Sequence, residues 1–114
     1  MPPRDWRLRV EDILQAIRKI QRLTGGTTLE KFSADEKTMD AVAYDLTAVG
    51  VATRHIPDDI LVRYGEIPWA KVRAIRNLTT HEYFRVSPPI VWDTAQRNLP
   101  AMAEVLERML FEHP

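Results

Sequence analysis

Hydrophobic residues recur every three or four positions along the first fifth of the chain, which is the spacing of one face of an α-helix. The stripe consists of Trp6, Val10, Ile13, Leu14, Ile17 and Ile20. Most positions between them are charged, so the pattern predicts an amphipathic helix from about Asp5 to Leu23 with one solvated face. Thr24-Gly25-Gly26-Thr27 follows, and paired glycines favour the end of a helix and a turn.

A second helix is predicted from Ser33-Ala34-Asp35-Glu36, which has the pattern of a capping box, to about Arg54. Its apolar stripe comprises Met39, Val42, Ala43, Leu46 and Val49. Gly50 lies on or beside this stripe. Glycine costs a helix about 1 kcal/mol relative to alanine, so its presence favours close approach by another helix. A short helix with proline in its first turn is predicted over residues 57–61.

Pro68-Trp69 opens a helix that we expect to run to about Phe84. Its packing face is predicted to contain Trp69, Val72, Ile75 and either Leu78 or Thr79. Ser87-Pro88-Pro89 predicts a break and a restart, and Leu99-Pro100 predicts a second restart or a kink, because an interior proline removes a hydrogen bond. The last helix is expected to present Met102, Val105, Leu106, Met109 and Leu110 to the core.

No segment has the alternating pattern of a strand, so the fold class predicted is all-α. The short connections favour a compact up-and-down bundle of four to five helices. At 114 residues the chain is long enough for one hydrophobic core but short of two, so residues 1–114 are expected to form a single domain.

Composition excludes several classes of protein. The 16 basic and 16 acidic residues cancel, which argues against nucleic-acid binding through a global positive field and leaves a local basic patch open. The chain has no cysteine, and its three histidines lack metal-ligand spacing, so neither a metal nor a cofactor is expected. No run of apolar residues has the length of a signal peptide or a membrane span, which predicts a soluble, cytoplasmic protein.

The densest group of chemically active side chains is Arg76-Asn77-Leu78-Thr79-Thr80-His81-Glu82-Tyr83. On a helix, Asn77 and His81 share one face, and Arg76 and Tyr83 flank it. Arginine binds phosphate through its planar donor fork, and histidine transfers protons near neutral pH, so the group suits phosphate chemistry. From spacing alone, an ordinary polar outer face of an amphipathic helix is an equally good interpretation.

The ordered motifs of the chain resemble those of the HepT-like toxins of the HEPN superfamily. The resemblance covers nearly the whole chain, and its most specific parts are the Ile67-Pro68-Trp69 opening and the Arg76-Asn77-x-x-x-His81-x-Tyr83 run. Supporting segments are Arg4-Asp5-Trp6, Glu11-Asp12-Ile13-Leu14, Arg63-Tyr64-Gly65-Glu66 and Ile90-Val91-Trp92-Asp93 before Leu99-Pro100.

This resemblance implies a HEPN-like helical bundle that forms a homodimer and cuts RNA without a metal ion. Arg76 and His81 would be the catalytic pair and Asn77 would support them. The partner would be a minimal nucleotidyltransferase antitoxin, which silences the toxin by attaching AMP to Tyr83.

The second helix departs from the family pattern. Where the family commonly has an asparagine and a Gly-Glu-Ala run lining the cleft, this chain has Asp45 and Gly50-Val51-Ala52. Valine lacks the charge of glutamate, and an aspartate in the cleft would repel phosphate. An inactive or weakened helical dimer that binds a nucleotide or a nucleotidyltransferase therefore stays open as an alternative function.

Several other residues carry weaker predictions. Lys71 and Arg73 form a small basic strip with Arg76, which is either a solvated face or an RNA-contacting track. His55 is interpreted as a helix-end residue and His113 as part of an uninformative tail. The three tryptophans, Trp6, Trp69 and Trp92, are expected to anchor the core or an interface.

Overall fold

A computed structural model describes residues 5–81 and 88–114, and of residues 76–81 it describes the backbone alone. The described residues are almost entirely helical. In chain order the helices are α1 (Trp6–Thr24), α2 (Leu29–Ala34), α3 (Glu36–Thr53), α4 (Asp58–Val62), α5 (Trp69–His81), α6 (Pro88–Asp93) and α7 (Leu99–Glu112). A π-helical segment, η2 (Thr94–Asn98), joins α6 to α7. The predicted all-α bundle is confirmed.

The first helix has the extent and the buried face that the hydrophobic spacing predicts. Asp5 caps α1, because its side chain accepts a hydrogen bond from the Arg7 amide at 2.9 Å. Its buried residues are Val10, Ile13, Leu14, Ile17, Ile20 and Thr24. The chain leaves the helix at Gly25 and turns at Gly26, whose φ of 75° is a conformation that favours glycine.

The predicted capping box at Ser33 is wrong. Thr28 caps the short α2, and Ser33 lies inside this helix, donating its hydroxyl hydrogen to the Leu29 carbonyl at 2.7 Å. Asp35 caps α3 instead, accepting from the Thr38 amide at 3.1 Å. Burial of Phe32 favours the extra helix, because its helical turn places that ring in the core beside Trp92.

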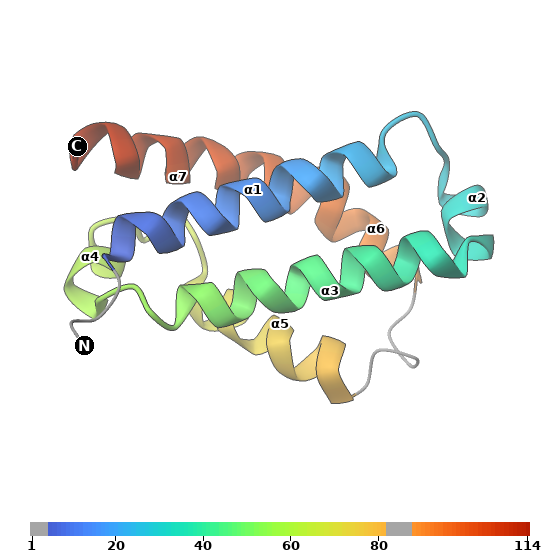
Figure 1. Ribbon diagram of the computed structural model, residues 1–114, viewed down its shortest axis with the longest axis horizontal. Coiled ribbons are helices and arrows are strands. Elements are labelled where there is room, and N and C mark those ends of the chain that lie inside the picture. Colours follow the sequence, from blue (N-terminus) through green and yellow to red (C-terminus); the bar gives the residue numbers. More distant parts are fainter. Residues whose placement is uncertain (1–4, 82–87) are drawn as a thin grey trace.

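The long helices run up and down, as Figure 1 shows. The α3 helix lies between α1 and α5 and makes extensive contact with both, while α7 packs on the other side of α1. Both described ends of the chain lie at one end of the bundle, and α5 runs away from this end along α3. The core is continuous, and its fully buried side chains include Ile13, Ile17, Phe32, Val42, Leu106 and Met109.

The restarts predicted at the two proline motifs are present. Pro88 begins α6, and Pro100 stands in the first turn of α7. Proline has no amide hydrogen and its ring crowds the preceding turn, so the chain widens into η2 just before it. There the Leu99 amide donates to the Thr94 carbonyl five residues back.

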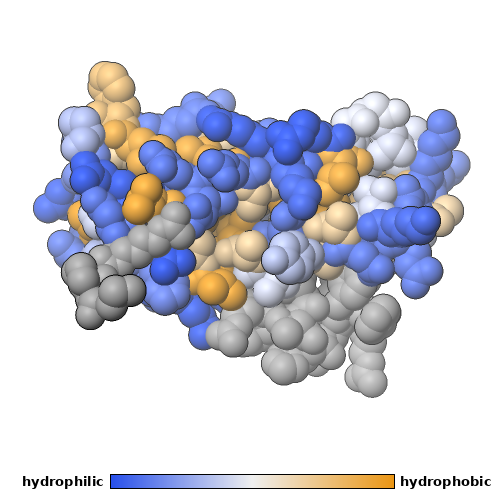
Figure 2. Space-filling model, in the orientation of Figure 1, coloured by the Kyte–Doolittle hydropathy of each residue, from blue (hydrophilic) through white to orange (hydrophobic). Residues whose placement is uncertain are grey.

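The face formed by α1 and α3 is largely hydrophilic, with hydrophobic side chains exposed in separate patches (Figure 2). Charged residues of α1 such as Arg18 and Lys19 are exposed, as the solvated face predicted for this helix requires. Within the described residues, none of the helices combines the length and apolar character needed to cross a membrane.

Candidate functional site

The candidate catalytic residues lie in the second half of α5. Its backbone stays helical through His81, so Arg76, Asn77 and His81 occupy the last two turns of one continuous helix. Tyr83 lies outside the described residues, as does the predicted continuation of this helix to Phe84. The position of Asn77 and His81 on one face of a helix is therefore supported by the backbone, whereas the position of Tyr83 stays a prediction.

Helix geometry gives the angular positions of the candidate RNA-contacting residues relative to Asn77 and His81. Arg73, Asn77 and His81 follow one another in steps of four, so each lies about 40° around the helix and about 6 Å along it from the previous one. Lys71 is exposed but lies about 120° around α5 from Asn77. Of the two candidate RNA contacts, Arg73 shares the Asn77 side and Lys71 does not.

Trp69 anchors the start of α5. Its side chain is 9% exposed, and its indole N–H is shared between two carbonyl oxygens, those of Leu61 at 3.1 Å and Tyr64 at 3.0 Å. These carbonyls belong to the end of α4 and the connector that follows. A single buried ring thereby fixes the first residue of α5 to the preceding helix, which positions the whole motif helix.

The connector before α5 is held in turn by the end of α7. The Tyr64 hydroxyl donates to Glu112 Oε1 at 2.6 Å and lies 3.1 Å from His113 Nε2. Burial raises the pKa of this phenol, and the bond to the Glu112 carboxylate adds to the effect. Arg108 stands over the Tyr64 ring and pairs with Glu66, whose pKa it lowers. His113, interpreted as uninformative from sequence, is part of this anchoring cluster.

Arg73 is held by a residue far from it in the sequence. Its Nη2 lies 3.0 Å from Oδ1 of Asp58, in the first turn of α4. Fifteen residues separate the two, so no helical spacing links them, and only the tertiary arrangement of the chain brings them together. Their opposite charges were the sole sequence signal.

The two positions at which α3 departs from the family pattern lie in different environments. Asp45 is 5% exposed and lies against α1, with Oδ1 at 3.7 Å from Nζ of Lys19. Its buried carboxylate therefore faces the ammonium group of a half-exposed lysine on α1, rather than lining an open cleft where it would repel phosphate. Val51 is 37% exposed on another side of the helix, and Gly50 is buried.

Gly50 and Ala43 stand seven residues apart on the buried arc of α3, on the side away from Asp45. Since Asp45 marks the side facing α1, these two small residues lie toward α5. A close approach of another helix at Gly50 stays a prediction.

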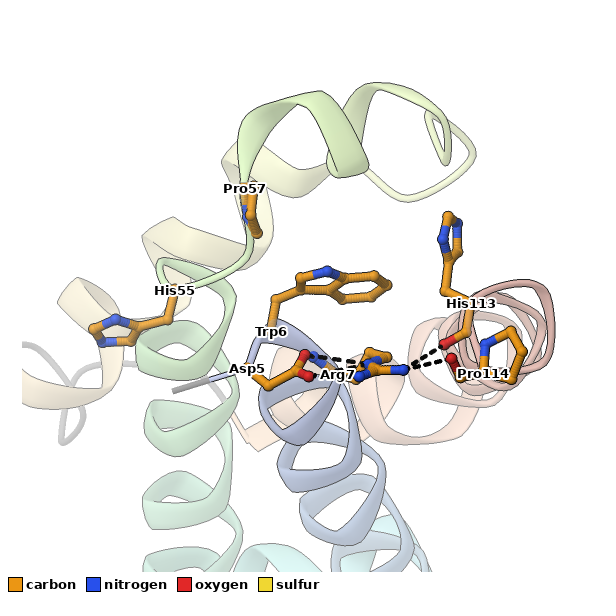
Figure 3. A pocket seen from close by; sticks show the side chains of 7 residues that line it. All are labelled: Asp5, Trp6, Arg7, His55, Pro57, His113 and Pro114. Atoms are coloured by element: carbon orange, nitrogen blue, oxygen red, sulfur yellow. Dashed lines mark hydrogen bonds and ion pairs between the residues drawn. The ribbon is translucent and has the colours of Figure 1, made fainter. Parts of the chain in front are cut away.

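A hollow of about 720 Å³ lies at the end of the bundle where α1 and α7 meet (Figure 3). The last turns of α5 lie away from this end (Figure 1). The hollow is lined by Asp5, Trp6, Arg7, His55, Pro57, His113 and Pro114. Arg7 bridges the Asp5 carboxylate and the main-chain oxygens of residues 113 and 114, and the Trp6 and His113 rings meet edge to face at 5.3 Å. These contacts join the two helix ends, which indicates that the residues lining the hollow stabilise the fold.

His55 is exposed just beyond the end of α3 and points away from Trp6 and His113 (Figure 3). The interpretation of His55 as a helix-end residue is confirmed. Across residues 5–81 and 88–114, no three side chains of histidine, aspartate or glutamate gather in a way that suits a metal ion.

Comparison with protein families matches residues 13–109 to the family described as "Ribonuclease HepT-like". A protein of Thermococcus cleftensis named "Probable ribonuclease HepT" is 33% identical over 88% of this chain and 91% of its own length. A protein of Methanocaldococcus jannaschii named "Putative RNase" is 30% identical over 96% of this chain and 91% of its own length. No solved structure matches the chain.

Proposed function

Because the chain belongs to the HepT-like ribonuclease family, we propose that this ribonuclease is the toxin of a toxin–antitoxin pair and that it cuts RNA internally without a metal ion. In this proposal Arg76 and His81 are the catalytic residues and Asn77 supports them. The observation that carries the assignment is the unbroken helix of α5 through His81, which keeps the three motif residues on one continuous element.

The chemistry needs two proton transfers and one site of charge stabilisation. The ribose 2′-hydroxyl loses its proton and attacks the phosphorus, and the leaving 5′-oxygen gains a proton as its bond to phosphorus breaks. His81 supplies proton transfer, which typically contributes roughly 10²–10⁴-fold. The Arg76 guanidinium stabilises the negative charge that develops on the phosphorane-like transition state.

A homodimer provides what a single motif helix lacks. Arg76 and His81 are five residues apart, which separates them by about 140° around α5. In addition, one imidazole cannot readily be the acid and the base of the same step. Two α5 helices facing each other across a two-fold axis supply a second arginine and a second histidine to one cleft.

Control by a minimal nucleotidyltransferase antitoxin completes the proposal. Tyr83 follows His81 by two residues, so AMP attached to its hydroxyl would add a base and a phosphodiester close to the catalytic residues. The phosphodiester would also be an anionic competitor for Arg76. Silencing would then be steric and electrostatic together.

The second candidate function is an inactive or weakened helical dimer that binds a nucleotide or a nucleotidyltransferase. Val51 favours it, because this exposed apolar side chain stands where the family resemblance places a glutamate. An exposed valine offers neither charge nor hydrogen bond to RNA.

Expression in a host cell and cleavage of RNA by purified protein test the proposal. The wild type is expected to arrest growth and to cut RNA in the presence of EDTA, while His81→Ala does neither and keeps the wild-type melting temperature. Equal harmlessness of the two proteins, together with no cleavage by either, would favour the inactive dimer.

The Tyr83→Phe variant tests the control step in the same experiment. Incubation with the antitoxin and ATP is expected to add the mass of AMP to the wild type but not to Tyr83→Phe. The variant should then stay toxic in the antitoxin's presence, since the phenol takes no part in cleavage. Modification and silencing of Tyr83→Phe would show that another residue, or simple binding, is responsible.

A further inference from the structure

Arg73 and Asp58 form a weak, single-point ion pair next to the motif. Only one contact joins them, from Nη2 to Oδ1 at 3.0 Å, rather than the two parallel bonds of a bidentate pair. The Asp58 side chain is 87% exposed and that of Arg73 is 34% exposed, so water screens the attraction. A stronger anion can therefore replace Asp58 at little cost.

The guanidinium is also held in place before any ligand arrives. Its Nε is buried and makes no hydrogen bond within the described structure, so the inner part of the side chain is packed while the outer nitrogen reaches Asp58. A side chain already restricted in this way loses less conformational entropy on binding than a free surface arginine.

Arg73 is aligned with the proposed catalytic residues. It precedes Asn77 by one turn and His81 by two, on the same side of α5, and the eight-residue separation corresponds to about 12 Å along the helix. An RNA strand held at His81 can present a phosphate one or two nucleotides from the cut over that distance.

We propose that Arg73 binds a backbone phosphate of the RNA near the one that is cut, and that Asp58 occupies Arg73 until RNA displaces it. This inference rests on the proposed function, because it takes RNA as the ligand. Asp58 is then a positioning residue, which acts on the substrate through Arg73 and lowers RNA affinity by competing for it.

Binding of a fluorescent single-stranded RNA to proteins carrying His81→Ala, measured by anisotropy, tests the proposal without cleavage of the probe. Adding Arg73→Ala is expected to weaken binding and to make the plot of log affinity against log salt shallower by about 0.7, the value for one lost phosphate contact. Arg73→Lys should retain most of the salt slope, because it keeps the charge.

Removal of the competitor is expected to act in the opposite direction. Asp58→Asn should tighten binding roughly two- to fivefold at low salt, the range of an exposed ion pair, and should have no effect when Arg73 is already alanine. The matched control is Asp59→Asn, which makes the same charge change at the next residue of α4, also exposed. It should leave the affinity near its starting value.

The outcomes distinguish the proposed nuclease function from the proposed role of Arg73. Cleavage by the wild type tests catalysis, and the salt dependence of binding tests the phosphate contact of Arg73. An unchanged salt slope in Arg73→Ala, or equal effects of the Asp58 and Asp59 variants, overturns the role of Arg73 even if the wild type cuts RNA. A lost phosphate contact in a protein that does not cut RNA supports Arg73 and overturns the nuclease. Melting temperatures of all variants exclude unfolding as the cause.

Discussion

At the scale of single residues, Asp45 shows how burial changes the pKa and the energetic contribution of a charged side chain. Oδ1 faces Lys19, but Oδ2 is buried and makes no hydrogen bond in the described part of the chain. Burial raises the pKa of this carboxyl, and the attraction of Lys19 only partly opposes it. The carboxylate is therefore an energetic cost to the native state at neutral pH.

The sign of this effect leads to a prediction for Asp45→Asn. A carboxyl whose pKa is higher in the folded state stabilises the fold when protonated, and this contribution is lost as the pH rises through its folded-state pKa. The amide that replaces the carboxyl is neutral at every pH. The variant is expected to raise the free energy of unfolding at pH 7 by on the order of 1 kcal/mol, with the gain vanishing below about pH 4.

Denaturant unfolding of both proteins between pH 4 and 8 measures this gain. Asp40→Asn is the matched control, because it removes the same charge from an exposed position on the same helix. A destabilised Asp45→Asn protein at pH 7 would show that the Lys19 pair outweighs the cost of burial.

At the scale of elements, the position of α5 depends on how its first residue is tied down. The Trp69 N–H bonds to the Leu61 and Tyr64 carbonyls close the link from α4 into the motif helix. Tyr64 is itself bonded to Glu112 near the end of α7. Three helices therefore meet at the N-terminal end of α5, on the other end from His81.

Trp69→Phe tests this anchor, because it keeps an aromatic ring and removes the N–H. The variant leaves two carbonyl oxygens without their shared donor, so a loss of roughly 1–3 kcal/mol in unfolding free energy is expected. Urea denaturation measures it. Trp92→Phe, where the ring packs against Phe32 at a centroid distance of 5.4 Å, is the comparison and should lose less. Equal losses would mean that ring volume, rather than the N–H bonds, fixes α5.

At the scale of the whole molecule, the proposed active site requires two chains. Sedimentation at micromolar concentration is expected to show a homodimer with its axis near α5. A monomer under these conditions would contradict a composite site, since a single His81 would then have to serve both proton transfers.

Mixing the wild type with His81→Ala gives a sharper test of the same prediction. If each dimer has one cleft that needs both His81 side chains, a dimer of one wild-type and one variant chain is inactive. After subunit exchange in an equal mixture, activity should fall to roughly half that of the same wild-type chains alone, because half of them pair with the variant. Activity should stay unchanged by mixing if each protomer holds a complete site.

The amino-acid sequence by itself determined the helices and most of the core, because helical spacing and proline restarts are local properties of the chain. Ile13, Ile17 and Leu106 are buried where their spacing predicts, and the motif residues that mark the family are contiguous on one helix. The cap at Asp35 in place of Ser33 was the local exception. It depended on burial of Phe32, a tertiary contact.

Only the tertiary structure decided which charged and polar groups meet. Asp58 reaches Arg73 across fifteen residues, Lys19 reaches Asp45 from another helix, and Tyr64 meets Glu112 across 48 residues. Such partners are set by how helices pack and rotate against one another. That packing is governed by the apolar faces of the helices. The residues next to a charged residue in the sequence therefore do not predict which group it contacts.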